Sequence, residues 1–89
     1  MNKIRRKEIA EIYDKMSSIM FDLDILKDRL ESVKEEEQES LDNLPENLQY
    51  SSRAEEMQDN VDKLDNSIEY LLQAIDSLQE SIDNIEDFE

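Results

Sequence analysis

Pairs of carboxylates one helical turn apart are the residues of this chain with the clearest potential for chemistry. Oxygens at this spacing can share a hard divalent cation such as Mg²⁺, and such pairs are abundant, among them Glu8 with Glu11, Asp59 with Asp62, Asp62 with Asp65, and Asp83 with Glu86. The chain holds 25 acidic residues among 89, so such pairs arise by chance. They also fall largely outside the apolar stripes described below, where water would solvate them. We therefore expect no metal site and no cofactor.

Catalysis without a metal needs a nucleophile and a general base, and the chain offers few candidates for either. It contains no cysteine and no histidine, which excludes thiolate nucleophiles, imidazole bases, disulfides and the usual zinc sites. Serine hydroxyls are present, but no base is available to activate them. The sequence therefore predicts a protein that is not an enzyme.

Two apolar stripes define the elements that position all the other side chains. The chain has no glycine and a single proline, Pro45, which favours long uninterrupted helices. Apolar residues recur at alternating steps of three and four, the heptad pattern of helices that pack side by side. The first stripe is Ile9, Ile12, Met16, Ile19, Leu23, Leu26, Leu30 and Val33; the second is Ala54, Met57, Val61, Leu64, Ile68, Leu71, Ile75, Leu78, Ile82 and Ile85.

The segment between the stripes predicts a turn. Pro45 would break a continuing helix, and Ser52 with Glu55 has the spacing of a capping box for a second helix. We expect helix 1 over about 3–41, a connector over 42–51 and helix 2 over about 52–86, all in one domain. Equal helices with a short link imply an all-α, antiparallel two-helix coiled-coil hairpin.

The turn also predicts a register, in which the numbers of opposing residues sum to about 93. Ile9 would then lie near Ile82 and Ile85, and Leu23 near Leu71. The basic residues at the start of helix 1 would lie beside acidic residues at the end of helix 2, giving each set neighbours of opposite charge. These two sets are Lys3, Arg5, Arg6 and Lys7, and Asp83, Glu86, Asp87 and Glu89.

The charge is unevenly distributed along the chain. The formal net charge is -15; residues 1–34 hold 8 basic and 7 acidic side chains, whereas residues 35–89 hold 2 basic and 18 acidic. This balance opposes direct binding to nucleic acid or anionic lipid and favours a protein partner with a basic surface. No apolar run approaches the length of a membrane span and no signal peptide is apparent, so we expect a cytoplasmic location.

The acidic surface has two interpretations. About 25 carboxylates along a rod of about 55 Å give one per ~2 Å, close to the ~1.7 Å of duplex DNA, so the rod could replace nucleic acid in a basic groove. The alternative is that the charge serves only solubility. If the surface binds a partner, the candidate residues are Glu35, Glu36, Glu37, Glu39, Asp59, Asp62, Asp65, Glu69 and Asp76.

Apolar residues outside the stripes suggest a second surface, near mid-length. They could be ordinary exposed side chains, or they could be the contact of a homodimer in which two hairpins form a four-helix bundle. The residues of this predicted oligomer contact are Tyr13, Met20, Phe21, Ile25, Tyr70 and Leu72.

The connector and the second stripe carry a family resemblance. Residues 41–57, LDNLPENLQYSSRAEEM, and residues 68–78, IEYLLQAIDSL, resemble small acidic helical proteins of phages and mobile elements of Gram-positive bacteria. The resemblance covers mainly residues 35–85 and is most specific over Asn43–Gln49. The resemblance implies that the chain comes from a phage or mobile element of a bacterial host. It implies no activity and identifies no functional residues.

Two functions are consistent with these features. The first is a non-enzymatic acidic protein-binding module, in its sharpest form a phage-encoded inhibitor that presents a nucleic-acid-like surface to a host defence protein. The alternative is a structural or assembly coiled-coil protein that acts through homo-oligomerisation.

Overall fold

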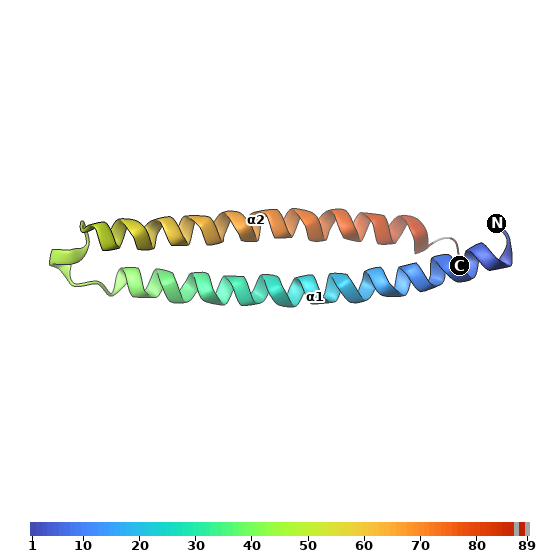
Figure 1. Ribbon diagram of the computed structural model, residues 1–89, viewed down its shortest axis with the longest axis horizontal. Helices are drawn as coiled ribbons and strands as arrows, with labels where there is room; N and C mark the ends of the chain where they lie inside the picture. The colour runs from blue at the N-terminus through green and yellow to red at the C-terminus, as the bar shows by residue number, and fades with distance from the viewer. Residues whose placement is uncertain (87, 89) are drawn as a thin grey trace.

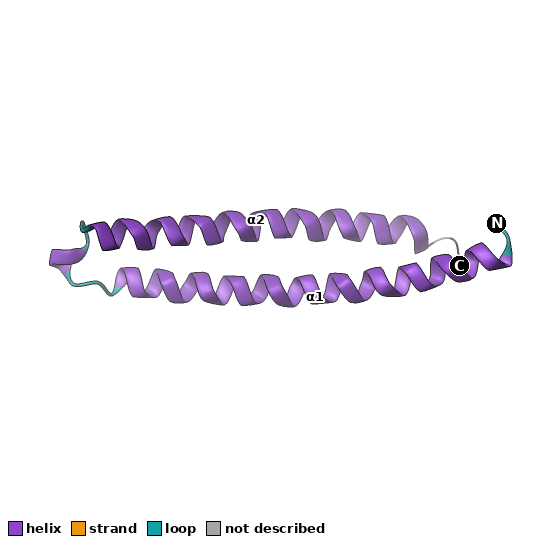
Figure 2. Ribbon diagram, viewed as in Figure 1, coloured by secondary structure: helices purple, strands orange, loops and turns teal. Residues whose placement is uncertain are grey.

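Two long antiparallel helices make up nearly the whole molecule. The computed structural model describes residues 1–86 and 88. Helix α1 spans Lys3–Asp42, a single 3-10 turn, η1, spans Glu46–Leu48, and helix α2 spans Ser52–Glu86. The helices lie side by side in a rod of 70 × 15 × 14 Å (Figure 1). All regular structure in the described residues is helical (Figure 2), which confirms the predicted all-α hairpin.

Local hydrogen bonds explain where the helices begin and end. The Asn2 side chain accepts a hydrogen bond of 2.8 Å from the backbone N–H of Arg5 and caps α1. Helix α1 ends before Pro45, whose carbonyl accepts the N–H of Leu48 at 2.8 Å and so closes η1. The chain therefore passes through a short 3-10 turn before α2 begins.

The cap of α2 differs from the prediction by one residue. Ser51 Oγ accepts the backbone N–H of Ala54 at 3.3 Å and donates to the carbonyl of Leu48 at 2.6 Å. The third residue after this cap is Ala54, so Glu55 is not placed to complete a capping box. The prediction of a Ser52 capping box was wrong. The hydroxyl of Ser51 instead caps the first turn of α2 and also hydrogen-bonds the carbonyl of Leu48 at the end of η1.

The apolar stripe of α2 forms the core as the heptad pattern predicted. Every member of the stripe is buried or half-buried. Among the described residues the buried side chains are Ala54, Met57, Val61, Ile68 and Ile82. No residue of α1 reaches the same burial. The core is therefore thin, as expected for two helices that cover only one side of each other.

Helix α1 is rotated relative to the predicted packing. Ile9, Met16, Leu23 and Leu30 are half-buried as expected, but the other half of the predicted stripe, Ile12, Ile19, Leu26 and Val33, remains exposed. The half-buried positions beside the first set are instead Tyr13, Met20, Lys27, Lys34 and Leu41. This shift corresponds to a rotation of roughly 50° about the helix axis.

The rotation has a physical reason in the width of the two stripes. Positions 12 and 13, and positions 19 and 20, are all apolar, so the apolar side of α1 is wider than the single stripe of α2 can cover. Turning toward Tyr13 and Met20 also lays the aliphatic stems of two lysines along the contact while their ammonium groups reach carboxylates. One apolar edge of α1 consequently stays outside the core.

The register also differs from the prediction. Lys34 Nζ lies 3.1 Å from Asp65 Oδ1, and Asn60 Nδ2 donates to Glu37 Oε2 at 3.0 Å. The numbers of these pairs sum to 99 and 97, so α2 is displaced by about five residues, or ~7 Å, from the expected position. The predicted neighbours of Ile9 and Leu23 are therefore wrong by about one turn or more.

The displacement arises at the connector and is visible at both ends of the rod. Helix α2 starts beyond the end of α1 at the connector, and α1 extends past the end of α2 at the other end (Figure 1). Among the described residues no ion pair joins the basic start of α1 to Asp83 or Glu86. The predicted charge pairing of the ends is wrong for these residues, and its other two acids, Asp87 and Glu89, lie outside the described residues.

Candidate protein-binding surface

The two open sides of the hairpin can be distinguished by the residues that meet between α1 and α2 on each side. Residues seven apart lie on the same side of a packed helix, because seven residues make nearly two turns. The Lys34–Asp65 pair marks one side. The other side is marked by a groove between Leu26, Val33 and Leu71. Each heptad row of α1 and α2 can then be assigned to one side.

Carboxylates gather on the side of the Lys34–Asp65 pair, which we call the acidic face. Two heptad rows from each helix form it, over residues 8–42 and 52–86. Its thirteen acids are Asp14, Asp24, Asp28, Glu31, Glu35 and Asp42 from α1, and Glu55, Asp62, Asp65, Glu69, Asp76, Asp83 and Glu86 from α2. More than half of the 25 acidic residues thus share one side of the rod.

Two lysines border the acidic face, and both are engaged with its carboxylates. Lys27 Nζ lies 3.3 Å from Asp28 and 3.9 Å from Asp24. The hydrogen bond to Asp28 and the charge of the same carboxylate raise the pKa of Lys27, and Glu31 and Asp24 add to this effect. Lys34 bridges to Asp65 on α2. Each ammonium group therefore neutralises the charge of only the carboxylates beside it, and the acidic face stays negative.

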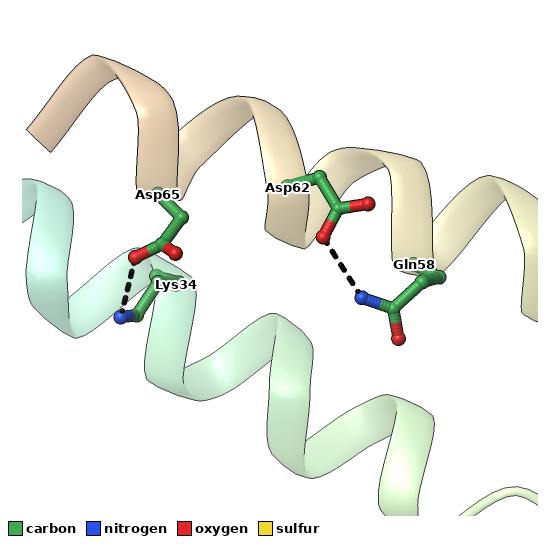
Figure 3. Close-up of polar contacts among 4 residues, drawn as sticks. All are labelled: Lys34, Gln58, Asp62 and Asp65. Carbon is green, nitrogen blue, oxygen red and sulfur yellow. Dashed lines mark hydrogen bonds and ion pairs between the residues drawn. The ribbon is translucent and has the colours of Figure 1, made fainter. Parts of the chain in front are cut away.

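The acidic face is hollowed near the connector. A groove of about 530 Å³ runs between the helices, lined by Lys34, Glu35, Gln38, Glu39, Asp42, Gln58, Val61, Asp62 and Asp65. Figure 3 shows how its α2 wall is held: Gln58 donates to Asp62 at 3.0 Å, one turn away, and Asp65 turns to Lys34. Five carboxylates and one ammonium group line the groove, so its chemistry suits a guanidinium or ammonium group from outside.

The predicted partner-binding residues are only partly brought together. Glu35, Glu39, Asp62 and Asp65 line the acidic groove, and Glu69 and Asp76 continue the same face along α2. The other three lie elsewhere. Glu37 is half-buried between the helices, where it accepts the Asn60 hydrogen bond, Glu36 lies on the opposite side of α1, and Asp59 points away from α1.

The six residues of the predicted oligomer contact do not share a surface. Tyr13 and Met20 are half-buried on the side of α1 that faces α2. The four exposed ones are Phe21, Ile25, Tyr70 and Leu72. Phe21 and Leu72 fall on the acidic face, Ile25 lies on the outer side of α1, and Tyr70 lies on the side opposite the acidic face.

The acids that sequence reasoning missed lie on the acidic face away from the two predicted segments. Asp14, Asp24, Asp28 and Glu31 of α1 were not singled out because basic residues accompany them in the sequence. The heptad spacing of Asp14 and Asp28 to Glu35 and Asp42, and of Asp24 to Glu31 in the neighbouring row, is a signal that could have found them, once the contacting side of α1 was known.

The described residues form neither a metal-binding cluster nor a helix that could span a membrane. No three of their carboxylates lie together in a way that could hold a metal ion. No helix formed by residues 1–86 combines the length and the apolar character needed to cross a bilayer.

Comparison of the chain with protein-family models, with curated proteins and with solved structures finds no match.

Proposed function

We propose that this chain is a non-enzymatic binding module whose acidic face docks onto a basic surface of a partner protein. The observation that carries the proposal is the segregation of thirteen carboxylates onto one side of the hairpin. A charge that served only solubility would need no preferred side, since solubility depends on net charge and on the absence of apolar patches. A one-sided arrangement concentrates the field where a cationic surface can approach.

The acidic groove is the anchor of this docking. Its carboxylates come from both helices, so an arginine or lysine entering it would meet acceptors on two sides. The Gln58–Asp62 hydrogen bond and the Lys34–Asp65 pair hold the α2 carboxylates before a partner arrives. A preorganised acceptor set loses less side-chain entropy on binding.

In its sharpest form the module replaces nucleic acid in a basic groove. The row Glu55, Asp62, Glu69, Asp76 and Asp83 repeats along α2 every seven residues, or every ~10 Å. The whole rod carries 25 carboxylates along 70 Å, about one per 2.8 Å. This linear charge density is lower than the density expected from the sequence, because the rod is longer than expected. It is still within a factor of two of the charge density of duplex DNA. The resemblance to small phage proteins is consistent with an inhibitor of a host protein.

The test begins with capture of the partner from a bacterial lysate and its purification. Calorimetry of the purified pair should then give an affinity that falls at least about tenfold between 50 and 200 mM salt, since exposed ion pairs are screened. A duplex oligonucleotide should compete for the partner if the basic surface is a nucleic-acid groove. An affinity that does not change with salt would contradict the proposal.

Charge reversals on the acidic face, compared with equal reversals elsewhere on the helices, test which surface binds the partner. The triple variant Asp62→Lys, Glu69→Lys and Asp76→Lys reverses three acids of the acidic face. The control Glu11→Lys, Asp59→Lys and Glu80→Lys changes the net charge equally on the outer sides of the helices. We expect the first variant to weaken binding at least about tenfold more than the second. Equal losses would mean that net charge, and not the acidic face, governs binding.

A further inference from the structure

The exposed edge of α1 forms a continuous apolar row. Ile12, Ile19, Leu26 and Val33 are spaced by seven residues, and their exposed fractions lie between 43% for Ile19 and 49% for Val33. Between this row and α2 runs a groove of about 410 Å³, lined by Leu26, Arg29, Leu30, Val33 and Leu71. Large aliphatic side chains at heptad spacing are the pattern that another helix packs against. The hairpin by itself leaves this row without a partner helix.

Helix α2 presents mainly uncharged residues on the same side. Its two rows there are Arg53, Asn60, Ser67, Ala74 and Ser81, and Glu56, Lys63, Tyr70, Ser77 and Asn84. From Ser67 onward these rows contain no charged residue. The small side chains of Ser67, Ala74 and Ser81 would let a further helix approach closely, and this row is the one nearer to the large apolar row of α1. We call this side, with the row from Ile12 to Val33, the apolar face.

The charge on the apolar face is balanced, unlike that of the molecule. The row of α1 that borders it alternates in sign through Glu8, Lys15, Asp22, Arg29 and Glu36. With Arg53, Glu56 and Lys63 from α2, the face carries four acidic and four basic side chains, against a net charge of -15 for the chain. A strongly cationic partner would gain little from this side. A second acidic hairpin could approach here without opposing rows of carboxylates.

The size of the apolar face is sufficient for a specific contact. The row from Ile12 to Val33 spans 22 residues, about 33 Å, and two adjacent helices are about 18 Å wide. Face-to-face packing would cover roughly 600 Å² on each copy, or roughly 1,200 Å² in total, which is within the range of stable interfaces. The thin core gives a further reason for association, since small domains bury little surface alone.

We propose that a second copy of this chain covers the apolar face, so that two hairpins form a four-helix bundle. The contact is made by Ile12, Ile19, Leu26 and Val33 of each copy. Both acidic faces then lie on the outside of the bundle, pointing in opposite directions. The proposal does not depend on the proposed partner binding, because it concerns the other side of the molecule.

Two isoleucines of α1 provide a matched test in the full chain. Ile19 lies on the apolar face and is 43% exposed, whereas Ile25 lies on the outer side and is 44% exposed. Sedimentation equilibrium at two concentrations should show a dimer for the native chain and for Ile25→Asp. The Ile19→Asp variant, which carries the same added charge, should raise the dissociation constant at least about tenfold.

Other outcomes would overturn the proposal. A native chain that is monomeric at both concentrations, or an Ile25→Asp variant that dissociates while Ile19→Asp does not, contradicts it. A monomer that instead gains mass only with an added amphipathic peptide would assign the apolar face to a different protein. If circular dichroism shows that Ile19→Asp has lost its helices, the pair Ile19→Ala and Ile25→Ala decides: only the first should weaken the dimer.

Salt separates this proposal from the preceding one. Two copies of net charge -15 repel each other, so screening should strengthen the dimer, whereas screening weakens docking to a basic partner. A dimer that dissociates as salt rises from 50 to 200 mM would contradict an apolar contact between like-charged copies.

Discussion

Truncation of Ile68 measures how much of the fold depends on the thin core. Ile68 lies at the middle of α2 and is 5% exposed, while Leu72, one turn further along the same helix, is 40% exposed. Replacing a buried isoleucine by alanine removes its transfer free energy and leaves a cavity, which together reduce the free energy of unfolding by 2–5 kcal/mol in well-packed proteins (order-of-magnitude range). Two helices can collapse around a cavity more easily than a closed core, so we expect about 2–3 kcal/mol for Ile68→Ala.

The matched variant Leu72→Ala should reduce the free energy of unfolding by less than about 1 kcal/mol. Much of the leucine side chain is already in water, and alanine is the better helix former. Urea denaturation followed by the helical circular dichroism signal gives both values. With a slope of roughly 1–1.5 kcal/mol per molar urea, Ile68→Ala should lower the midpoint by about 2 M and Leu72→Ala by well under 1 M.

The comparison must be made at one protein concentration, because association would add to the apparent stability. Equal effects of the two truncations would refute the assigned packing. A larger effect of Leu72→Ala would mean that a different side of α2 faces α1, and the assignment of the acidic and apolar faces would fail with it.

Two further predictions concern single polar contacts. Ser51→Ala should reduce the free energy of unfolding by about 1 kcal/mol through loss of the α2 cap, whereas Ser52→Ala, at the position favoured by sequence reasoning, should change it by less than about half as much; equal values in urea titrations would contradict the cap at Ser51. A double-mutant cycle on Lys34→Ala and Asp65→Ala should give a coupling of roughly 0.2–1 kcal/mol that disappears near 1 M salt, as for other exposed ion pairs. No coupling at low salt would argue against the observed register.

The sequence predicted α2 better than α1, and the reason lies in the width of the two stripes. Apart from Tyr70, Leu72 and Ala74, the apolar residues of α2 from Ala54 to Ile85 form one narrow stripe, which marks one side for packing along most of the helix. Helix α1 has adjacent apolar pairs, such as Ile12 with Tyr13 and Ile19 with Met20. The heptad pattern identifies the apolar side of such a helix, but the edge that meets its neighbour is decided by packing between the helices.

Register and surface were harder to predict for related reasons. The stagger depends on how η1 carries the chain between the helices, which the position of Pro45 alone does not determine. The acidic residues were visible in the sequence, but assigning them to one face required the rotation of α1. The two uncharged rows, Ser67, Ala74 and Ser81 and Tyr70, Ser77 and Asn84, could have been noticed by heptad spacing alone, since the other exposed rows of α2 contain acids along this part of the helix.

The two faces have a joint consequence for binding. In the proposed bundle each acidic face looks outward, so one dimer could engage two basic surfaces or two sites of one partner. Linked sites raise the effective concentration of the second contact, and the gain is lost when the link is broken. Ile19→Asp should then weaken binding to a bivalent or surface-immobilised partner through loss of avidity, while leaving the affinity for a single soluble site unchanged. Loss of the single-site affinity in this variant would mean that the apolar face itself contacts the partner. The assignment of partner binding to the acidic face and of dimerisation to the apolar face would then be wrong.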